Sequence, residues 1–223
     1  MSNPDSFIDE VSEELRRDQF NRMLTRYGWI AALVVLVIVG GAGFNEWRQA
    51  QAETQARALG DAIDLAYREP DPAARAAALA AIEGAESAPM VGFLEGSALL
   101  AAGEPTQAVA RFEALAETHA GDEILRDLAL IRMVAAMEQA GGAPADRRDI
   151  LDPMISADGA FALLALEQRA VSFIEDGDRE AALEDLNRIF GAVDVTAALR
   201  DRTQTLIVAL GGDVPTPARL LDE

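Results

Sequence analysis

The chain has 223 residues, half of them hydrophobic, and a formal net charge of −19 at pH 7. Such an acidic chain repels phosphate backbones, which argues against nucleic-acid binding. It has no cysteine, and all 19 basic residues are arginine, so thiol chemistry, lysine-based catalysis and a phosphate-loop lysine are excluded.

A short acidic segment, residues 1–26, precedes the most apolar part of the chain. It holds six acidic and four basic side chains, and the basic ones are Arg16, Arg17, Arg22 and Arg26. Only Arg48 and Arg57 follow the apolar stretch closely. Under the positive-inside rule, this asymmetry predicts that residues 1–26 lie in the cytoplasm and that the rest of the chain after the stretch lies outside.

The apolar stretch, residues 27–44 (YGWIAALVVLVIVGGAGF), contains no charge and predicts a transmembrane helix. Eighteen helical residues rise about 27 Å, close to the thickness of a bilayer's hydrocarbon core. Aromatic residues gather at both ends, as they do at membrane interfaces. We expect an uncleaved span over residues 27–47. The alternatives are a buried core helix and a signal peptide cleaved near Gly41-Ala42-Gly43.

The remaining residues predict an all-α domain. They are rich in Ala, Leu, Glu and Arg and poor in β-branched runs, a pattern typical of helices. Turn signals divide them into segments long enough for helical hairpins. These signals are Glu69-Pro70-Asp71-Pro72, Gly103-Glu104-Pro105, Gly141-Gly142-Ala143-Pro144 and Asp176-Gly177-Asp178.

The second predicted hairpin has a spacing that recurs. Gly96 and Ala108 would let two antiparallel helices approach closely, Phe112 would fill the space between them, and Gly103 would end the first helix before Pro105 starts the second. The full set is Gly96, Leu99, Gly103, Ala108, Phe112 and Leu115. Moving on by 74 residues gives a second match in register, with Ala170, Phe173, Gly177, Ala182, Leu186 and Ile189.

Two further hairpins match less well. In the first, Arg75 replaces the small residue, and the other positions are Ile63, Ala66, Pro70, Leu79 and Ile82. In the third, either Asp146 or Arg147 stands where a small residue belongs, because the double glycine leaves the register open. We expect the segment from Val193 to Leu210 to cap the stack, since a row of repeats must cover its last apolar face.

Over roughly residues 48–190 these spacings resemble the tetratricopeptide-repeat superfamily. The whole layout, with an acidic head (FIDEVSEELRRDQF), one span and an acidic alanine-rich repeat domain, is similar to the YfgM-type ancillary subunits of the bacterial SecYEG translocon. The resemblance implies an inner-membrane protein with a periplasmic repeat domain at residues 48–192 and a capping helix and tail at 193–223. It also implies protein partners: the translocon, periplasmic chaperones or exported clients.

In a tetratricopeptide array the first helices of the hairpins line a concave surface. By register, the candidate partner-binding residues are Met90, Phe93, Leu100, Leu128, Ile131, Leu164, Val171 and Ile174, with Ser97 among them. They are mostly apolar, which would suit extended hydrophobic segments or a partner helix. The alternative is that the C-terminal helix or the neighbouring hairpins cover them.

No residue pattern indicates an enzyme, a metal site, a cofactor or a small-molecule substrate. His119 is the only histidine and is expected at a helix end, where it can form neither a common zinc site nor a nucleophile relay. The acidic run at residues 175–180 lacks the spacing of an EF-hand loop. The remaining alternatives are a scaffold for another envelope assembly, such as cytochrome maturation or outer-membrane protein insertion, and a hydrolase with a carboxylate pair.

Overall fold

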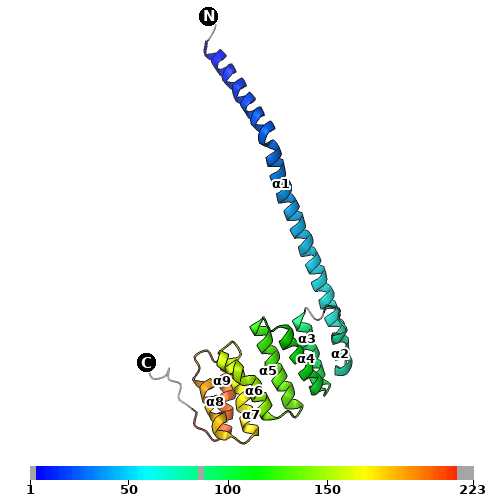
Figure 1. Ribbon diagram of the computed structural model, residues 1–223, viewed down its shortest axis with the longest axis vertical. Helices are drawn as coiled ribbons and strands as arrows, with labels where there is room; N and C mark the ends of the chain where they lie inside the picture. The colour runs from blue at the N-terminus through cyan, green and yellow to red at the C-terminus, as the bar shows by residue number, and fades with distance from the viewer. Residues whose placement is uncertain (1–3, 85–87, 215–223) are drawn as a thin grey trace, which may run out of the picture. The chain divides into compact units, whose positions relative to one another are not determined.

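The computed structural model describes residues 4–84 and 88–214 (Figure 1). Within the first helix, the side chains at positions 4–25, 27–29, 31, 32 and 35 lie outside that description. The described residues form nine helices, which confirms the predicted all-α class for this part of the chain. The helices are α1 (Pro4–Tyr67), α2 (Pro72–Ala80), α3 (Pro89–Ala101), α4 (Pro105–Thr118), α5 (Glu123–Gln139), α6 (Pro144–Ala157), α7 (Ala162–Glu175), α8 (Arg179–Gly191) and α9 (Ala197–Ala209).

The chain divides into two compact units, Met1–Gly60 and Asp61–Glu223. Across the residues that the structure describes, no helix is both long and apolar enough to cross a membrane. Six positions of the predicted span at 27–47 have side chains outside the described part, and so do Arg16, Arg17 and Arg22.

Most helices in the second unit begin at a proline or at a residue whose side chain caps the first turn. Proline occupies the start of α2, α3, α4 and α6, where its missing N–H costs no hydrogen bond. At the start of α5 and α8 a side chain caps the helix: Asp122 accepts from Leu125 N at 3.1 Å, and Asp178 accepts from Ala181 N at 3.1 Å. Asp178, the last residue of the predicted turn Asp176-Gly177-Asp178, is thus the N-cap of α8.

Four helices, α3, α5, α7 and α9, end in the same way. Each is followed by a glycine in the left-handed region, Gly103, Gly141, Gly177 or Gly211, with φ between +70° and +79°. The next residue then donates its backbone N–H to the carbonyl five residues back, as in Glu104 N to Leu99 O at 2.9 Å. These helices are therefore bounded alike, as successive first members of hairpins.

The second unit is a row of hairpins. From α2 to α9 each helix packs against the next, and α3 with α5 and α5 with α7 also make contact. Figure 1 shows these helices following one another side by side. A helix that contacts both the next helix and the next but one is the arrangement expected of stacked helical hairpins.

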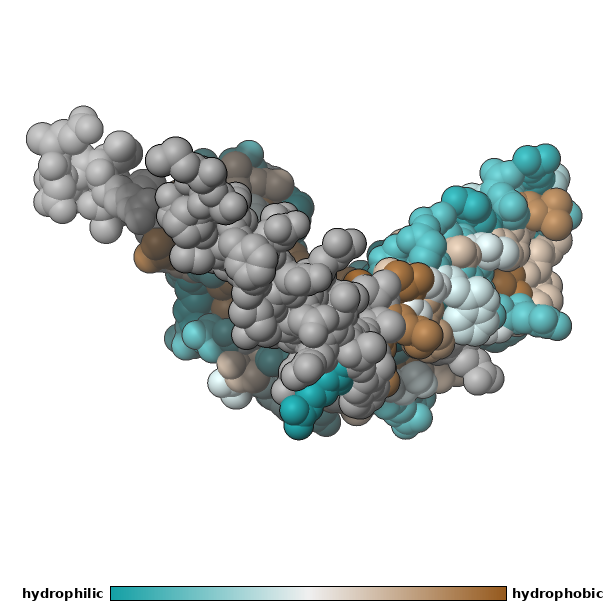
Figure 2. Space-filling model, turned by 90° about the horizontal axis from the view of Figure 1, so that it is seen from above, coloured by the Kyte–Doolittle hydropathy of each residue, from teal (hydrophilic) through white to brown (hydrophobic). Residues whose placement is uncertain are grey.

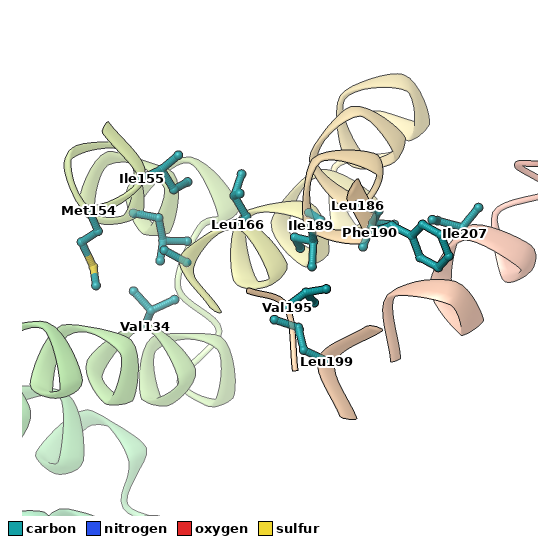
Figure 3. Close-up of a cluster of buried hydrophobic side chains, with 13 residues drawn as sticks. Val134, Met154, Ile155, Leu166, Leu186, Ile189, Phe190, Val195, Leu199 and Ile207 are labelled. Atoms are coloured by element: carbon teal, nitrogen blue, oxygen red, sulfur yellow. The ribbon is translucent and has the colours of Figure 1, made fainter. Parts of the chain in front are cut away.

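Two apolar cores run through this row. One joins α4 and α5 around Phe112, and α3 packs Phe93 and Leu99 against it. The other joins α5 to α9, and Figure 3 shows its side chains from Val134 to Ile207 pointing toward one another. The half-buried Leu130 and Ile150 touch both cores, so the hydrophobic interior is continuous from α3 to α9.

The predicted packing within the second hairpin is confirmed. Phe112 and Ala108 are fully buried, and a Cβ added at Gly96 would lie only 2.5 Å from the Phe112 ring. In the fourth hairpin, Ala182 and Leu186 are likewise fully buried, while Phe173 is half-buried. In these two hairpins, small residues therefore bring the two helices together around one large side chain.

The third hairpin resolves the alternative that its sequence left open. Arg147 is 1 % exposed, whereas Asp146 is exposed, so Arg147 takes the position of the small residue. Gly142 supplies the extra residue in the turn, and its N–H bonds to Met137 O at 2.8 Å. The guanidinium of Arg147 pairs with Glu175 at the end of α7 and lies 3.8 Å from Glu138 at the end of α5. A salt bridge thus connects the ends of α5 and α7 at this position.

Candidate partner-binding site

The predicted partner-binding residues lie on α3, α5 and α7, the three helices that start successive hairpins. Met90 is 65 % exposed. The other seven are half-buried: Phe93, Leu100, Leu128, Ile131, Leu164, Val171 and Ile174. Each therefore retains some accessible apolar surface.

Several of these side chains are anchored by the cores below them. Phe93 has its ring centroid 6.3 Å from that of Phe112, and Leu100 packs against the same core. Ile131 and Leu164 pack against the core shared by α5 to α9. We call the eight predicted partner-binding residues the apolar row. This packing fixes the geometry of the four members just named, and fixed side chains lose less conformational entropy when a partner binds.

Polar groups lie between the apolar side chains of this row. Arg132 of α5 donates to Ser97 Oγ of α3 at 3.3 Å, and Ser97 Oγ donates to Phe93 O at 2.7 Å. Farther along, Arg202 of α9 binds both carboxylate oxygens of Glu167 of α7, at 2.7 and 2.8 Å. Hydrogen bonds to Glu167 raise the pKa of the Arg202 guanidinium. On one face of the molecule, Figure 2 shows small hydrophobic patches set among hydrophilic residues.

Two ion pairs that were not predicted from the sequence each link the two helices of one hairpin. Glu95 of α3 binds Arg111 of α4 at 2.5 Å, and Arg169 of α7 binds Asp185 of α8 at 2.6 Å. Both pairs span 16 residues, and they lie 74 residues apart with the charges exchanged. Oppositely charged residues at the same spacing in both hairpins are the sequence signal that could have predicted these ion pairs.

The second of these ion pairs extends into a small network. Arg169 also binds Asp152 of α6 at 2.7 Å, and its guanidinium lies 5.9 Å from the Phe173 ring centroid. The hydrogen bond to Asp185 raises the pKa of the Arg169 guanidinium, burial opposes that shift, and the hydrogen bond to Asp152 adds to it. Arg169 therefore stays cationic throughout the physiological range and joins α6, α7 and α8.

A groove of about 560 Å³ lies between α2, α3 and α4. Seven of its twelve lining residues are alanines, which leave the walls smooth and the space open. Glu95 and Arg111 form part of the lining, and so do Glu104 and Gln107, whose side chains are hydrogen-bonded at 3.2 Å. No pattern in the sequence predicts this groove.

The only histidine of the chain lies at a helix end. His119 is the C-cap residue of α4, the helix-end position predicted for it. Over residues 4–84 and 88–214, no three side chains of the metal-binding types gather closely enough to hold a metal ion.

Comparison with known proteins returned no matching family model, curated protein or solved structure.

Proposed function

We propose that the protein is a membrane-anchored interaction module, with a cytoplasmic N-terminus and a periplasmic domain of tetratricopeptide-like hairpins. One observation carries the proposal: half-buried apolar side chains recur on α3, α5 and α7, above two cores that hold them in place. Such a surface suits protein segments better than small polar substrates.

Anchoring is the second part of the proposal, and the uncharged stretch at residues 27–44 supports it. A span would hold the domain at the membrane surface and raise its effective concentration next to an exit channel, so weak contacts would suffice. With the resemblance to translocon subunits, this makes the Sec translocon the leading partner, with exported clients or periplasmic chaperones bound by the domain.

Co-purification in a mild detergent tests the partner. Full-length protein should bring down SecY, and a version exported by a cleavable signal and starting at Gln49 should lose most of that association, because it lacks the tether. If the Gln49 version retains SecY as well as the full-length protein does, anchoring plays no part. If the full-length protein brings down no SecY, the scaffold for another envelope complex becomes the better proposal.

Photo-crosslinking in cells tests the surface. A crosslinking amino acid at Phe93 or Ile131 should capture partner polypeptides, because both side chains belong to the apolar row. The matched control is Glu113, an exposed residue of α4 outside that row, where capture should be weak. Equal capture at Phe93 and Glu113 would contradict the assignment of the apolar row as the binding surface.

A further inference from the structure

An arginine recurs at one position of α5 and α9. Counting back nine residues from the left-handed glycine that follows each helix, Gly141 or Gly211, gives Arg132 on α5 and Arg202 on α9. Each guanidinium donates to a residue 35 positions earlier in the chain, on α3 in one case and on α7 in the other. The two arginines therefore have equivalent places in the row of hairpins, and their surroundings can be compared directly.

Arg202 shows which group an arginine at this position binds. Its Nε and Nη2 donate to the two carboxylate oxygens of Glu167 of α7, at 2.7 and 2.8 Å. Two such hydrogen bonds between a guanidinium and a carboxylate are charge-assisted and directional, and they are stronger than hydrogen bonds between neutral groups. The ligand that the chain itself supplies at this position is therefore a carboxylate.

Arg132 lacks that ligand. Among the residues that the structure describes, it pairs with no carboxylate, and its Nη2 donates instead to the uncharged Ser97 Oγ at 3.3 Å. The Ser97 hydroxyl donates its own hydrogen to Phe93 O at 2.7 Å, so it can only accept from Arg132. Arg132 is exposed, and its other N–H groups are accessible to a partner. A positive charge with free donors therefore lies between α3 and α5.

Neighbouring acidic residues do not supply the missing counter-charge. The acidic residue of α3 and the two nearest to Arg132 along α5 are each engaged by another arginine: Glu95 by Arg111 at 2.5 Å, Asp127 by Arg126 at 2.7 Å, and Glu138 by Arg147 at 3.8 Å. The net charge of −19 on the whole chain does not replace them, because exposed charges more than about 8 Å apart are largely screened at physiological ionic strength.

We propose that Arg132 binds an aspartate or glutamate side chain within the partner segment that lies on the apolar row, an inference that rests on the proposed function. Two members of the row flank the site, because Leu128 lies one turn before Arg132 on α5 and Phe93 lies one turn before Ser97 on α3. Further members lie on either side of α5, which contacts both α3 and α7. A segment that crosses the row meets Arg132 in its interior, which favours a side-chain carboxylate over the carboxylate at a chain end.

Desolvation gives this position its selectivity. A partner segment that covers Arg132 removes water from the guanidinium, and with only apolar groups opposite, the N–H donors would lose their hydrogen bonds without replacement. A carboxylate restores those hydrogen bonds and supplies the counter-charge. Arg132 therefore selects for segments that carry an acidic residue among apolar ones, and against segments that are entirely apolar.

The test uses full-length protein in a nonionic detergent, at physiological ionic strength, with a photo-crosslinking amino acid at Phe93. The probes are fluorescent peptides of leucine, alanine and serine, capped at both ends, with either glutamate or glutamine as the central residue. We expect the glutamate peptide to be captured about tenfold more efficiently than the glutamine peptide. A third peptide has the central glutamine and a free carboxyl terminus, and it should be captured no better than the capped glutamine peptide.

The variant Arg132→Gln should abolish this preference, so that the glutamate and glutamine peptides are captured equally. Arg132 is exposed, so the substitution should leave the fold intact, and circular dichroism melts check this. The matched control is Arg188→Gln, which removes the same charge from an exposed position of α8, outside the three helices that carry the apolar row. It should retain the tenfold preference.

Equal capture of the glutamate and glutamine peptides by protein that retains Arg132 would overturn the inference and leave the apolar row as the binding surface. A preference that persists in Arg132→Gln, or that is lost in Arg188→Gln, would also overturn it. Preferential capture of the peptide with the free carboxyl terminus would assign Arg132 to a chain end and not to a side chain. If no peptide is captured at Phe93, the apolar row fails as a binding surface, and this inference fails with it.

Discussion

At the scale of single residues, the second hairpin depends on the contact between a glycine and an aromatic ring. Phe112→Ala should lower the free energy of unfolding by about 3–5 kcal/mol, because it removes a fully buried ring and leaves a cavity against Gly96. Glu113→Ala, on the exposed side of the same helix, should change it by less than about 0.5 kcal/mol. Urea unfolding followed by circular dichroism measures both, and equal effects would contradict the packing.

The exchanged ion pairs permit a charge-swap experiment. Glu95→Arg alone would set two arginines side by side, and Arg111→Asp alone would set two acids side by side in a partly buried place. Each single change should destabilise the domain by at least about 2 kcal/mol. The double variant recreates the arrangement of Arg169 and Asp185, and its stability should return to within about 1 kcal/mol of the original.

The matching control for that experiment is a swap that cannot form a pair. Glu95→Arg combined with Glu113→Asp leaves the new arginine beside Arg111, because Glu113 is an exposed residue outside the pair. Its stability should equal that of Glu95→Arg alone. Additive effects of Glu95→Arg and Arg111→Asp in the double-mutant cycle would show that the two side chains do not interact.

Arg147 is a buried charge in a position that holds alanine in the second and fourth hairpins. Its partners Glu175 and Glu138 are 36 % and 44 % exposed and can be hydrated without it, while its own Nε has no hydrogen-bond partner. Arg147→Met, which keeps much of the volume, should therefore change stability by no more than about 1 kcal/mol in either direction.

Arg147→Ala separates the contribution of packing from that of charge. It should cost about 2–4 kcal/mol, because a cavity would replace a side chain that is 1 % exposed. Thermal melts of the two variants decide between packing and charge. Equal destabilisation by methionine and alanine would mean that the ion pairs, and not the buried stem, hold α5, α6 and α7 together here.

At the scale of helices, left-handed glycines end four of them alike. Gly177→Ala should cost about 1–2 kcal/mol, because φ is +79° and a Cβ disfavours that conformation although nothing lies within 4 Å of it. Gly191→Ala at the end of α8, with equally open surroundings and no positive φ, should be neutral or stabilising by up to about 1 kcal/mol. Thermal melts that rank the two variants in the opposite order would contradict the role of Gly177.

The last described helix, α9, ends like the first helix of a hairpin, but the residues on one of its faces differ from those of α7. Counting back from Gly211 as from Gly177, Arg200 and Gln204 of α9 stand where α7 has the buried Leu166 and Ala170. Gln204 is exposed, and the residues of α9 that are buried are Leu199, Thr203 and Ile207. Because its outer face is polar, α9 can cover the core of α7 and α8 without needing a further helix on top.

At the scale of the whole molecule, the arginine asymmetry around residues 27–44 sets the expected orientation. A reporter active only in the periplasm should be active when fused after Glu223 and inactive when fused before Met1. Neutralising Arg16, Arg17, Arg22 and Arg26 together should mix the two orientations, because that end loses its basic excess. The reverse reporter pattern would exclude the periplasmic location and, with it, the proposed partners.

The sequence by itself determined the all-α class, the turns that separate the helices, and the residues that pack between the two helices of the second and fourth hairpins. Helix ends depend on local chemistry, so Pro105, Gly177 and Asp178 could be assigned from neighbours a few residues away. Gly96, Ala108 and Phe112 could be placed because close helix packing demands small and large residues at set spacings. The apolar row could be located on α3, α5 and α7 by the same register.

Tertiary structure alone decided the features that depend on side chains from separate helices. The burial of Arg147 in place of Asp146 follows from one extra residue in the turn at Gly142, and only the packed neighbours show which side chain points inward. The groove between α2 and α4 exists because alanines on two helices face each other across α3. An alanine has the same local preference on any exposed helix, so only the arrangement of the helices distinguishes a groove wall from ordinary surface.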